Sequence, residues 1–254
     1  MKFFYFFLLC VTTPCAFATD SAVSGQISVT ALQQVDKPPH FSKSVKILFP
    51  RVSENKKRNP VNVQLQVTAS NESLEDKCFA VFMDNHPPFR VEKKVGHVNS
   101  RKALVSFFLP LSLERGQHLI RIFSIDSQGI MLDKNAQLNS CSFYFLDPKK
   151  SSETTFDDAN PILSLLSPYP SQSHILGQHI LLDVHFSDKN KQVADPKVVL
   201  SIDNQFVSLV TSDQVYKIEG LGRGEHRIRL VLYDGKYNYS NSPLTSCDRM
   251  VTVN

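Results

Sequence analysis

An internal repeat constrains the fold of this chain more than any other feature of its sequence. Residues 114–122 (ERGQHLIRI) recur as residues 222–230 (GRGEHRIRL), and an aspartate follows each copy at the same distance. Three further pairs of segments match in the same order, namely residues 45–50 with 163–168, 82–85 with 201–204, and 140–141 with 246–247. Four matches in one order indicate a duplication, so we expect two similar domains.

Within each copy, apolar and polar residues alternate. Residues 61–67 (VNVQLQV) alternate throughout, and residues 180–186 are their counterpart. Such alternation predicts β-strands with one buried face. Shorter apolar runs of the same kind occupy residues 78–83, 103–109, 118–125, 142–146, 198–202, 215–221, 226–233 and 249–253. About seven short strands in each copy of about 100 residues are typical of a β-sandwich, and the chain is predicted to be all-β.

The repeat also sets the domain boundaries. We expect domain 1 at residues 45–147 and domain 2 at residues 161–254, joined by a polar linker, residues 148–160, that prolines bracket. Such a composition buries little apolar surface. Residues 19–44 precede the first copy as an N-terminal segment, in which residues 26–32 alternate enough to add an edge strand.

The N-terminus resembles an export signal. Lys2 precedes nine apolar residues, 3–11, and a small-x-small pattern follows at residues 16–18. Nine apolar residues cannot span a bilayer core that needs about 20. Cys10 and Cys15 lie in this segment, but neither follows the small residue that precedes a lipidated cysteine. We therefore predict a signal peptide, residues 1–18, cleaved after Ala18, and a secreted or periplasmic mature protein.

Three cysteines follow the predicted cleavage site, and an odd number excludes a complete disulfide framework. Cysteines within apolar strands are usually inert core residues. The alternative is a disulfide between Cys78 and Cys141 inside domain 1, which would leave Cys247 as a free thiol.

The sequence carries no catalytic or metal-binding motif, so we predict a non-enzymatic protein without cofactor or metal. The repeated His118 and His226 each follow a glycine at a strand entry, where a structural role is expected. Asp183 and His185 share one strand face, but Gln64 and Gln66 replace them in the first copy, so we expect a solvated face. A formal net charge of +4 is too weak and dispersed for nucleic-acid binding.

The repeated segment resembles the penultimate strand of bacterial immunoglobulin-like and fibronectin-III-like modules. The similarity lies in Leu-x-x-Gly-x-His-x-Ile followed by an aspartate at residues 221–234, in the related residues 113–126, and in the Asp-Asn after the third strand. The resemblance implies two tandem immunoglobulin-like β-sandwich domains in an exported stalk, adhesive or accessory protein. The chain departs from antibody domains because it has no Trp and no repeated pair of core cysteines.

Two surfaces are candidates for partner binding. One is the loop at residues 85–101, where His86, Pro87, Pro88 and Phe89 offer a stiff apolar contact, unless it is an ordinary hairpin connection. The other is the strand face after each Gly-x-His, which carries the residues Arg121, Phe123, Arg229 and Tyr233. That face suits a binding patch, but packing against the linker or the other domain is the favoured interpretation.

The expected partner is another envelope or extracellular protein. The alternative function is that of a carbohydrate-binding or enzyme-accessory protein of the cell envelope. Sugar-binding sandwiches usually stack sugars on Trp or Tyr, and this chain has no Trp and seven Tyr.

Overall fold

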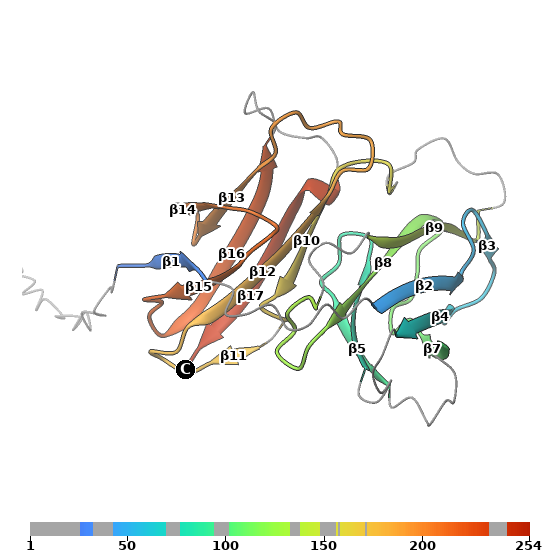
Figure 1. Ribbon diagram of the computed structural model, residues 1–254, viewed down its shortest axis with the longest axis horizontal. Coiled ribbons are helices and arrows are strands. Elements are labelled where there is room, and N and C mark those ends of the chain that lie inside the picture. The colour runs from blue at the N-terminus through green and yellow to red at the C-terminus, as the bar shows by residue number, and fades with distance from the viewer. Residues whose placement is uncertain are drawn as a thin grey trace, which may run out of the picture.

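The computed structural model describes residues 26–32, 43–69, 77–93, 102–132, 138–147, 156, 158–170, 172–233 and 243–254 (Figure 1). The predicted signal peptide lies outside these residues. Over the described part the chain is all-β, as predicted, and its one helical element is the short 3-10 turn η1 (Pro243–Thr245). The strands form four sheets that pair into two sandwiches, which we call module 1 and module 2.

Module 1 is a sandwich of a three-stranded and a five-stranded sheet. The first sheet has the order β2-β4-β7, with β2 (Lys43–Phe49), β4 (Asn62–Ala69) and β7 (Lys102–Phe108). The second has the order β3-β9-β8-β5-β6, with β3 (Asn55–Lys56), β9 (Asn139–Phe145), β8 (Gly116–Ile125), β5 (Lys77–Met83) and β6 (Phe89–Lys93).

Module 2 repeats this arrangement and adds one strand. Its first sheet has the order β1-β15-β12-β10, with β1 (Ser28–Ala31), β15 (Val215–Glu219), β12 (Ile180–Ser187) and β10 (Ile162–Ser167). Its second has the order β11-β17-β16-β13-β14, with β11 (Ser173–His174), β17 (Ser246–Val253), β16 (Gly224–Tyr233), β13 (Lys197–Ile202) and β14 (Gln205–Val210). The short β3 and β11 each run parallel to the last strand of their module.

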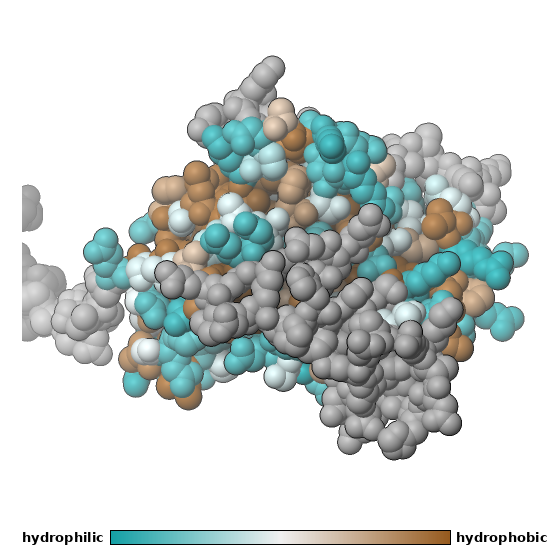
Figure 2. All heavy atoms as spheres, in the orientation of Figure 1, coloured by the Kyte–Doolittle hydropathy of each residue, from teal (hydrophilic) through white to brown (hydrophobic). Residues whose placement is uncertain are grey.

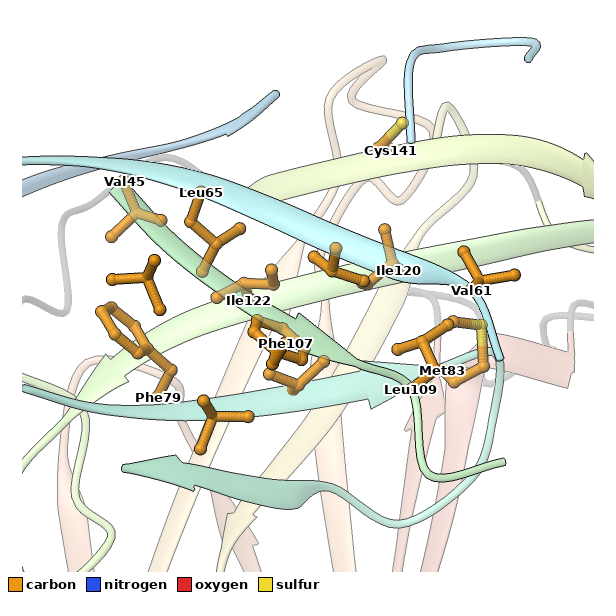
Figure 3. Packing of buried hydrophobic residues seen from close by; sticks show 14 of the residues in the cluster. Val45, Val61, Leu65, Phe79, Met83, Phe107, Leu109, Ile120, Ile122 and Cys141 are labelled. Atoms are coloured by element: carbon orange, nitrogen blue, oxygen red, sulfur yellow. The ribbon is translucent and has the colours of Figure 1, made fainter. Parts of the chain in front are cut away.

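Each module has its own hydrophobic core, because the alternating residues of both sheets point into the space between them. In module 1, Leu65 of β4, Phe79 of β5 and Ile122 of β8 belong to one buried cluster, and Figure 3 shows side chains of both sheets meeting in it. In module 2, Leu182 of β12 and Leu230 of β16 belong to the equivalent cluster. The predicted duplication therefore corresponds to two separate cores of the same design.

Two predicted features differ from the structure. The segment at residues 85–101, expected to be one long loop, contains strand β6, which pairs antiparallel with β5. Its counterpart β14 was also not predicted, and it follows a two-residue turn at Asp203 and Asn204, which both have positive φ. This is the geometry of a tight hairpin turn, which places consecutive strands side by side.

The N-terminal strand is real, but it belongs to module 2. β1 pairs antiparallel with β15, from Ser28 opposite Glu219 to Ala31 opposite Tyr216, and Ile27 and Val29 pack against the core of module 2. A Cβ at Gly220 would lie 2.6 Å from the carbonyl oxygen of Gln26, so only glycine permits this close approach. A segment that precedes module 1 in the sequence thus closes the sheet edge of the other module.

Candidate functional site

The repeated histidines are structural, as predicted. His118 Nδ1 lies 2.8 Å from Asp84 Oδ2 and its Nε2 lies 2.8 Å from the carbonyl oxygen of Glu114, while Asp84 Oδ1 accepts the amide of Leu119. In module 2, His226 makes the same contacts with Asp203 Oδ2 at 2.7 Å and with the carbonyl oxygen of Gly222 at 2.9 Å. The aspartate of the Asp-Asn motif therefore binds the histidine of the Gly-x-His motif in each module, and this contact holds neighbouring strands together.

Both partners of each histidine accept hydrogen bonds, so the doubly protonated imidazolium suits the site. Burial opposes that charge, but the hydrogen bonds to Asp84 and to the Glu114 carbonyl raise the pKa of His118 above its ordinary value. The pKa of His226 is raised for the same reasons, by Asp203 and the carbonyl of Gly222. In each pair both ring nitrogens of the histidine are hydrogen-bonded, so neither is free to act as a catalytic base or a metal ligand.

The modules meet in a buried contact region, which we call the seam. The outer face of the five-stranded sheet of module 1 packs on the outer face of β10 and β12 in module 2, and these elements lie side by side in Figure 1. The apolar part of the seam consists of Ala80, Phe82, Phe123, Ile125, Met131 and Leu166. A second cluster joins Leu119 of module 1 to Ile162 and Leu244 of module 2.

Arg121 is the central polar residue of the seam. Its side chain is 1% exposed, and its Nη1 donates to Ser164 Oγ at 2.6 Å and to the carbonyl oxygen of Leu163 at 3.3 Å. Its Nη2 donates to the carbonyl oxygen of Asp84, and the guanidinium carbon lies 4.9 Å from the centre of the Phe82 ring. One side chain of module 1 therefore binds the backbone and a hydroxyl of module 2.

Asp183 and His185 belong to the seam and do not form a solvated face, so that prediction is wrong. Asp183 is fully buried, and its Oδ2 accepts the amide of Met131 at 2.7 Å across the seam. The His185 ring lies 5.1 Å from that of Phe123 in an edge contact. Asp183 and His185 occupy the repeat positions of Gln64 and Gln66. This difference between the copies was the sequence signal of their role, because only module 2 packs this outer sheet face against the other module.

The linker takes part in the same contact. Asp158 Oδ2 lies 2.6 Å from Ser140 Oγ of module 1 and 2.5 Å from Lys189 Nζ of module 2. Burial raises the pKa of Asp158, but the bonds from Lys189 and Ser140 outweigh it and lower that pKa. Phe156 packs against the second seam cluster. The linker thus contributes two residues, Asp158 and Phe156, that contact both modules.

The predicted surface patch divides between buried and half-buried positions. Arg121 and Phe123 are buried in the seam, so the binding-patch interpretation is wrong for them and the alternative, packing against the other module, is confirmed. Arg229 and Tyr233 occupy the equivalent outer face of module 2 and are half-buried. The structure therefore does not bring the four residues together.

The first part of the predicted binding loop, residues 84–88, is the hairpin connection between β5 and β6, and residues 94–101 lie outside the described residues. His86 and Pro87 are exposed, but Pro88 is buried and Phe89 begins strand β6. The Phe89 ring lies 6.2 Å from that of Phe107 in an edge contact and packs against the core of module 1. Phe89 is not an exposed apolar contact, because the β5–β6 pairing turns its side chain inward.

The Cys78–Cys141 disulfide is not formed, and Cys78, Cys141 and Cys247 are all free thiols. Cys78 packs against the seam cluster, whereas Cys141 belongs to the core of module 1. The two side chains therefore point to opposite faces of the five-stranded sheet, where β8 separates their strands. Burial raises the pKa of Cys141 to about 11, so its thiol is a poor nucleophile.

The outer face of the five-stranded sheet of module 2 is open where its counterpart in module 1 is buried. On this face Phe206 is 67% exposed and Leu209 is 53% exposed, and they lie beside Ser201 and Val199 of β13. Hydrophobic side chains gather over β13 and β14 in Figure 2. We call Val199, Phe206 and Leu209 the open face.

Module 1 also has a hollow of about 550 Å³ between β2 and β9, lined by residues 46–52 and 138–141. Arg51 and Lys56 lie 5.2 Å and 5.7 Å from the centre of the Phe49 ring there. Over the described ranges, no group of three His, Cys, Asp or Glu side chains is placed to hold a metal ion. In the same part of the chain, no helix is long and apolar enough to cross a membrane.

Comparisons with known proteins give similarities to solved structures only. No family model matches the chain, and no curated protein matches it. It is similar to fibronectin(III)-like modules of Clostridium thermocellum CbhA, with 11% identity, 83% of this chain and 94% of that chain covered, and a TM-score of 0.31.

Two further structures are similar to the chain. The first is titin A168–A169, with 9% identity, 85% of this chain and 98% of that chain covered, and a TM-score of 0.25. The second is Bacteroides ovatus SGBP-B in complex with a mixed-linkage heptasaccharide, with 14% identity, 83% and 47% covered, and a TM-score of 0.20. The strand order of the chain itself shows that its two modules are β-sandwiches, as the alternating sequence pattern predicted.

Proposed function

We propose that this chain is an exported, non-enzymatic binding protein, in which the seam fixes two immunoglobulin-like modules at one angle and the open face of module 2 binds a partner protein. Modules of this kind typically serve as binding or spacer units of bacterial surface proteins. The signal-peptide pattern at residues 1–18 supports export, and the partner is then an envelope or extracellular protein.

The observation that carries this proposal is that the same outer sheet face is buried in module 1 and exposed in module 2. In module 1 that face carries Phe82 and Phe123 and is buried against module 2. In module 2 the equivalent face keeps Phe206 and Leu209 exposed. Clustered exposed apolar residues on a sheet mark interaction sites more often than scattered ones. A rigid support also reduces the ordering cost of binding.

The test uses the mature chain, residues 19–254, with a photoreactive phenylalanine analogue at position 206, in envelope extract of the source organism. We expect one predominant cross-linked protein, and we expect Leu209→Asp in the same chain to abolish its capture. The matched control places the analogue at Phe108 of module 1, which is 63% exposed, and this position should not capture the same protein.

Equal capture from positions 108 and 206 would contradict a specific open face. Binding of the mature chain to a glycan array, with no protein captured, would favour the carbohydrate-binding alternative. N-terminal sequencing of the protein recovered from the envelope should begin at Thr19, and a chain that retains residues 1–18 in the cytoplasm would refute the export proposal.

A further inference from the structure

A small cavity lies within the seam. It has a volume of about 20 Å³ and is lined by buried or half-buried residues of both modules and by four exposed residues. The first group is Phe82, Arg121, Leu163, Leu165, Cys247 and Arg249, and the second is Asn85, His86, Pro87 and Asp248. A space of about 10–15 Å³ is enough for one water molecule. The cavity therefore suits a single water or a monatomic ion, and it is too small for phosphate, sulfate or a carboxylate ligand.

Two buried guanidinium groups line this cavity with unused donors. Arg121 donates to three oxygens through its Nη atoms, but its Nε has no hydrogen-bond partner in the part of the chain that the structure describes. Arg249 is 4% exposed, and its Nη2 donates to the carbonyl oxygen of Leu165 at 3.1 Å. Among the described residues, its Nε and Nη1 have no hydrogen-bond partner. Buried donors without acceptors are costly and rare in folded proteins.

Arg249 is specific to the second copy of the repeat. Arg249 lies opposite Ile228, and the equivalent Ile120 of module 1 lies opposite Cys141, which is a core residue of that module. An arginine at this position carries a charge into a region that module 1 fills with the small thiol side chain of Cys141. The arginine is therefore not explained by the sandwich itself.

Among the residues that the structure describes, no carboxylate forms an ion pair with either arginine, although the nearby charge of Asp84 favours the cationic form of Arg121. Asp84 binds His118 and the amide of Leu119 through its carboxylate, and Asp248 pairs with Arg227. Burial lowers the pKa of Arg121 and of Arg249 to about 10 each, so both remain cationic at neutral pH.

Cys247 lies beside both arginines but does not supply a negative charge. Burial raises its pKa to about 11, although Arg121 and Arg249 act to lower it. The thiol is therefore neutral at physiological pH. Two buried cations with unpaired donors strongly favour a bound counterion.

We propose that Arg121 and Arg249 bind one small monovalent anion, of the size of chloride, in the cavity between the modules. The anion accepts from Arg121 Nε and from Arg249 Nε and Nη1, and it joins a residue of module 1 to a residue of module 2. Anion binding then stabilises the docked arrangement of the two modules.

The direct test is a crystal of the wild-type mature chain grown in bromide. We expect an anomalous peak in the cavity between the two guanidinium groups. In solution, the unfolding temperature should rise with chloride concentration at constant ionic strength, with gluconate as the replacement anion because it is too large to enter. Above the dissociation constant, each tenfold rise in chloride adds about 1.4 kcal/mol to the free energy of unfolding.

Arg249→Gln should remove the chloride-specific increase, and the matched control Arg229→Gln, at the repeat position of Arg121, should retain it. If Arg249→Gln does not fold, the wild-type bromide measurement decides the question alone. A cavity that contains only water, or bromide peaks confined to the protein surface, would overturn the proposal.

Discussion

Truncating Phe123 to alanine tests the coupling of the two modules. Phe123 extends from β8 of module 1, is almost fully buried, and contacts Phe82 at 5.5 Å and His185 of module 2 at 5.1 Å between ring centroids. Phe→Ala substitutions at buried sites lower the free energy of unfolding by about 3–5 kcal/mol. We expect a loss in this range, because the seam residues on both sides cannot collapse into the cavity without moving whole sheets.

Urea unfolding followed by circular dichroism measures the size of this effect, since the chain has no Trp for fluorescence. Hydrogen exchange then locates it, and amides of β10 and β12 in module 2 should exchange faster although the substitution is in module 1. The matched control is Phe206→Ala, whose exposed side chain should change stability by no more than about 0.5 kcal/mol.

A loss below about 1 kcal/mol for Phe123→Ala would contradict the description of the seam as a packed core. Exchange that increases only within β5 and β8 would contradict the coupling, because it would mean that module 2 does not depend on the contact.

Three further predictions concern the repeated pair, the N-terminal strand and the thiols. The raised pKa of His118 means that its contribution to stability is fully present below the unfolded pKa of about 6.5 and is lost as pH rises through the higher folded value. The stability difference between wild type and His118→Gln should thus shrink as pH rises above about 6.5, and a constant difference in thermal unfolding would be inconsistent with this. Gly220→Ala should displace β1 and remove exchange protection at residues 28–31, whereas Gly222→Ala, where a Cβ meets nothing within 4 Å, should not; equal protection in both variants would disprove the close approach. Mass spectrometry after alkylation in denaturant should find Cys78 and Cys141 both modified without reduction, and an unmodified pair would demonstrate the disulfide after all.

The sequence predicted the fold well because the sandwich cores depend on local alternation. Residues 61–67 and 180–186 each place every second side chain in a core, and the repeat gives both modules the same strand order. The histidine pairs were also predictable, since a Gly-x-His before a strand and an Asp after another appear twice. Because the same contact occurs in both modules, it supports the fold of each module and not the contact between them.

The seam was less predictable, because it depends on how two complete sandwiches dock. Arg121 and Arg229 occupy the same place in the repeat, yet only Arg121 is buried, and no local pattern distinguishes them. The only sequence indication of the seam came from positions at which the two copies differ, such as Asp183 at the repeat position of Gln64. The pairing of β1 with β15 was likewise hidden, since it joins segments that are far apart in the chain.

Residual dipolar couplings of backbone amides, measured on the mature chain by NMR, test the central claim most directly. If the seam holds the two sandwiches at a fixed angle, couplings from β4, β5 and β8 in module 1 and from β12, β13 and β16 in module 2 should fit one common alignment tensor. Separate tensors of clearly different magnitude for the two modules would show that they move independently, and the seam would then not be the element that organises this protein.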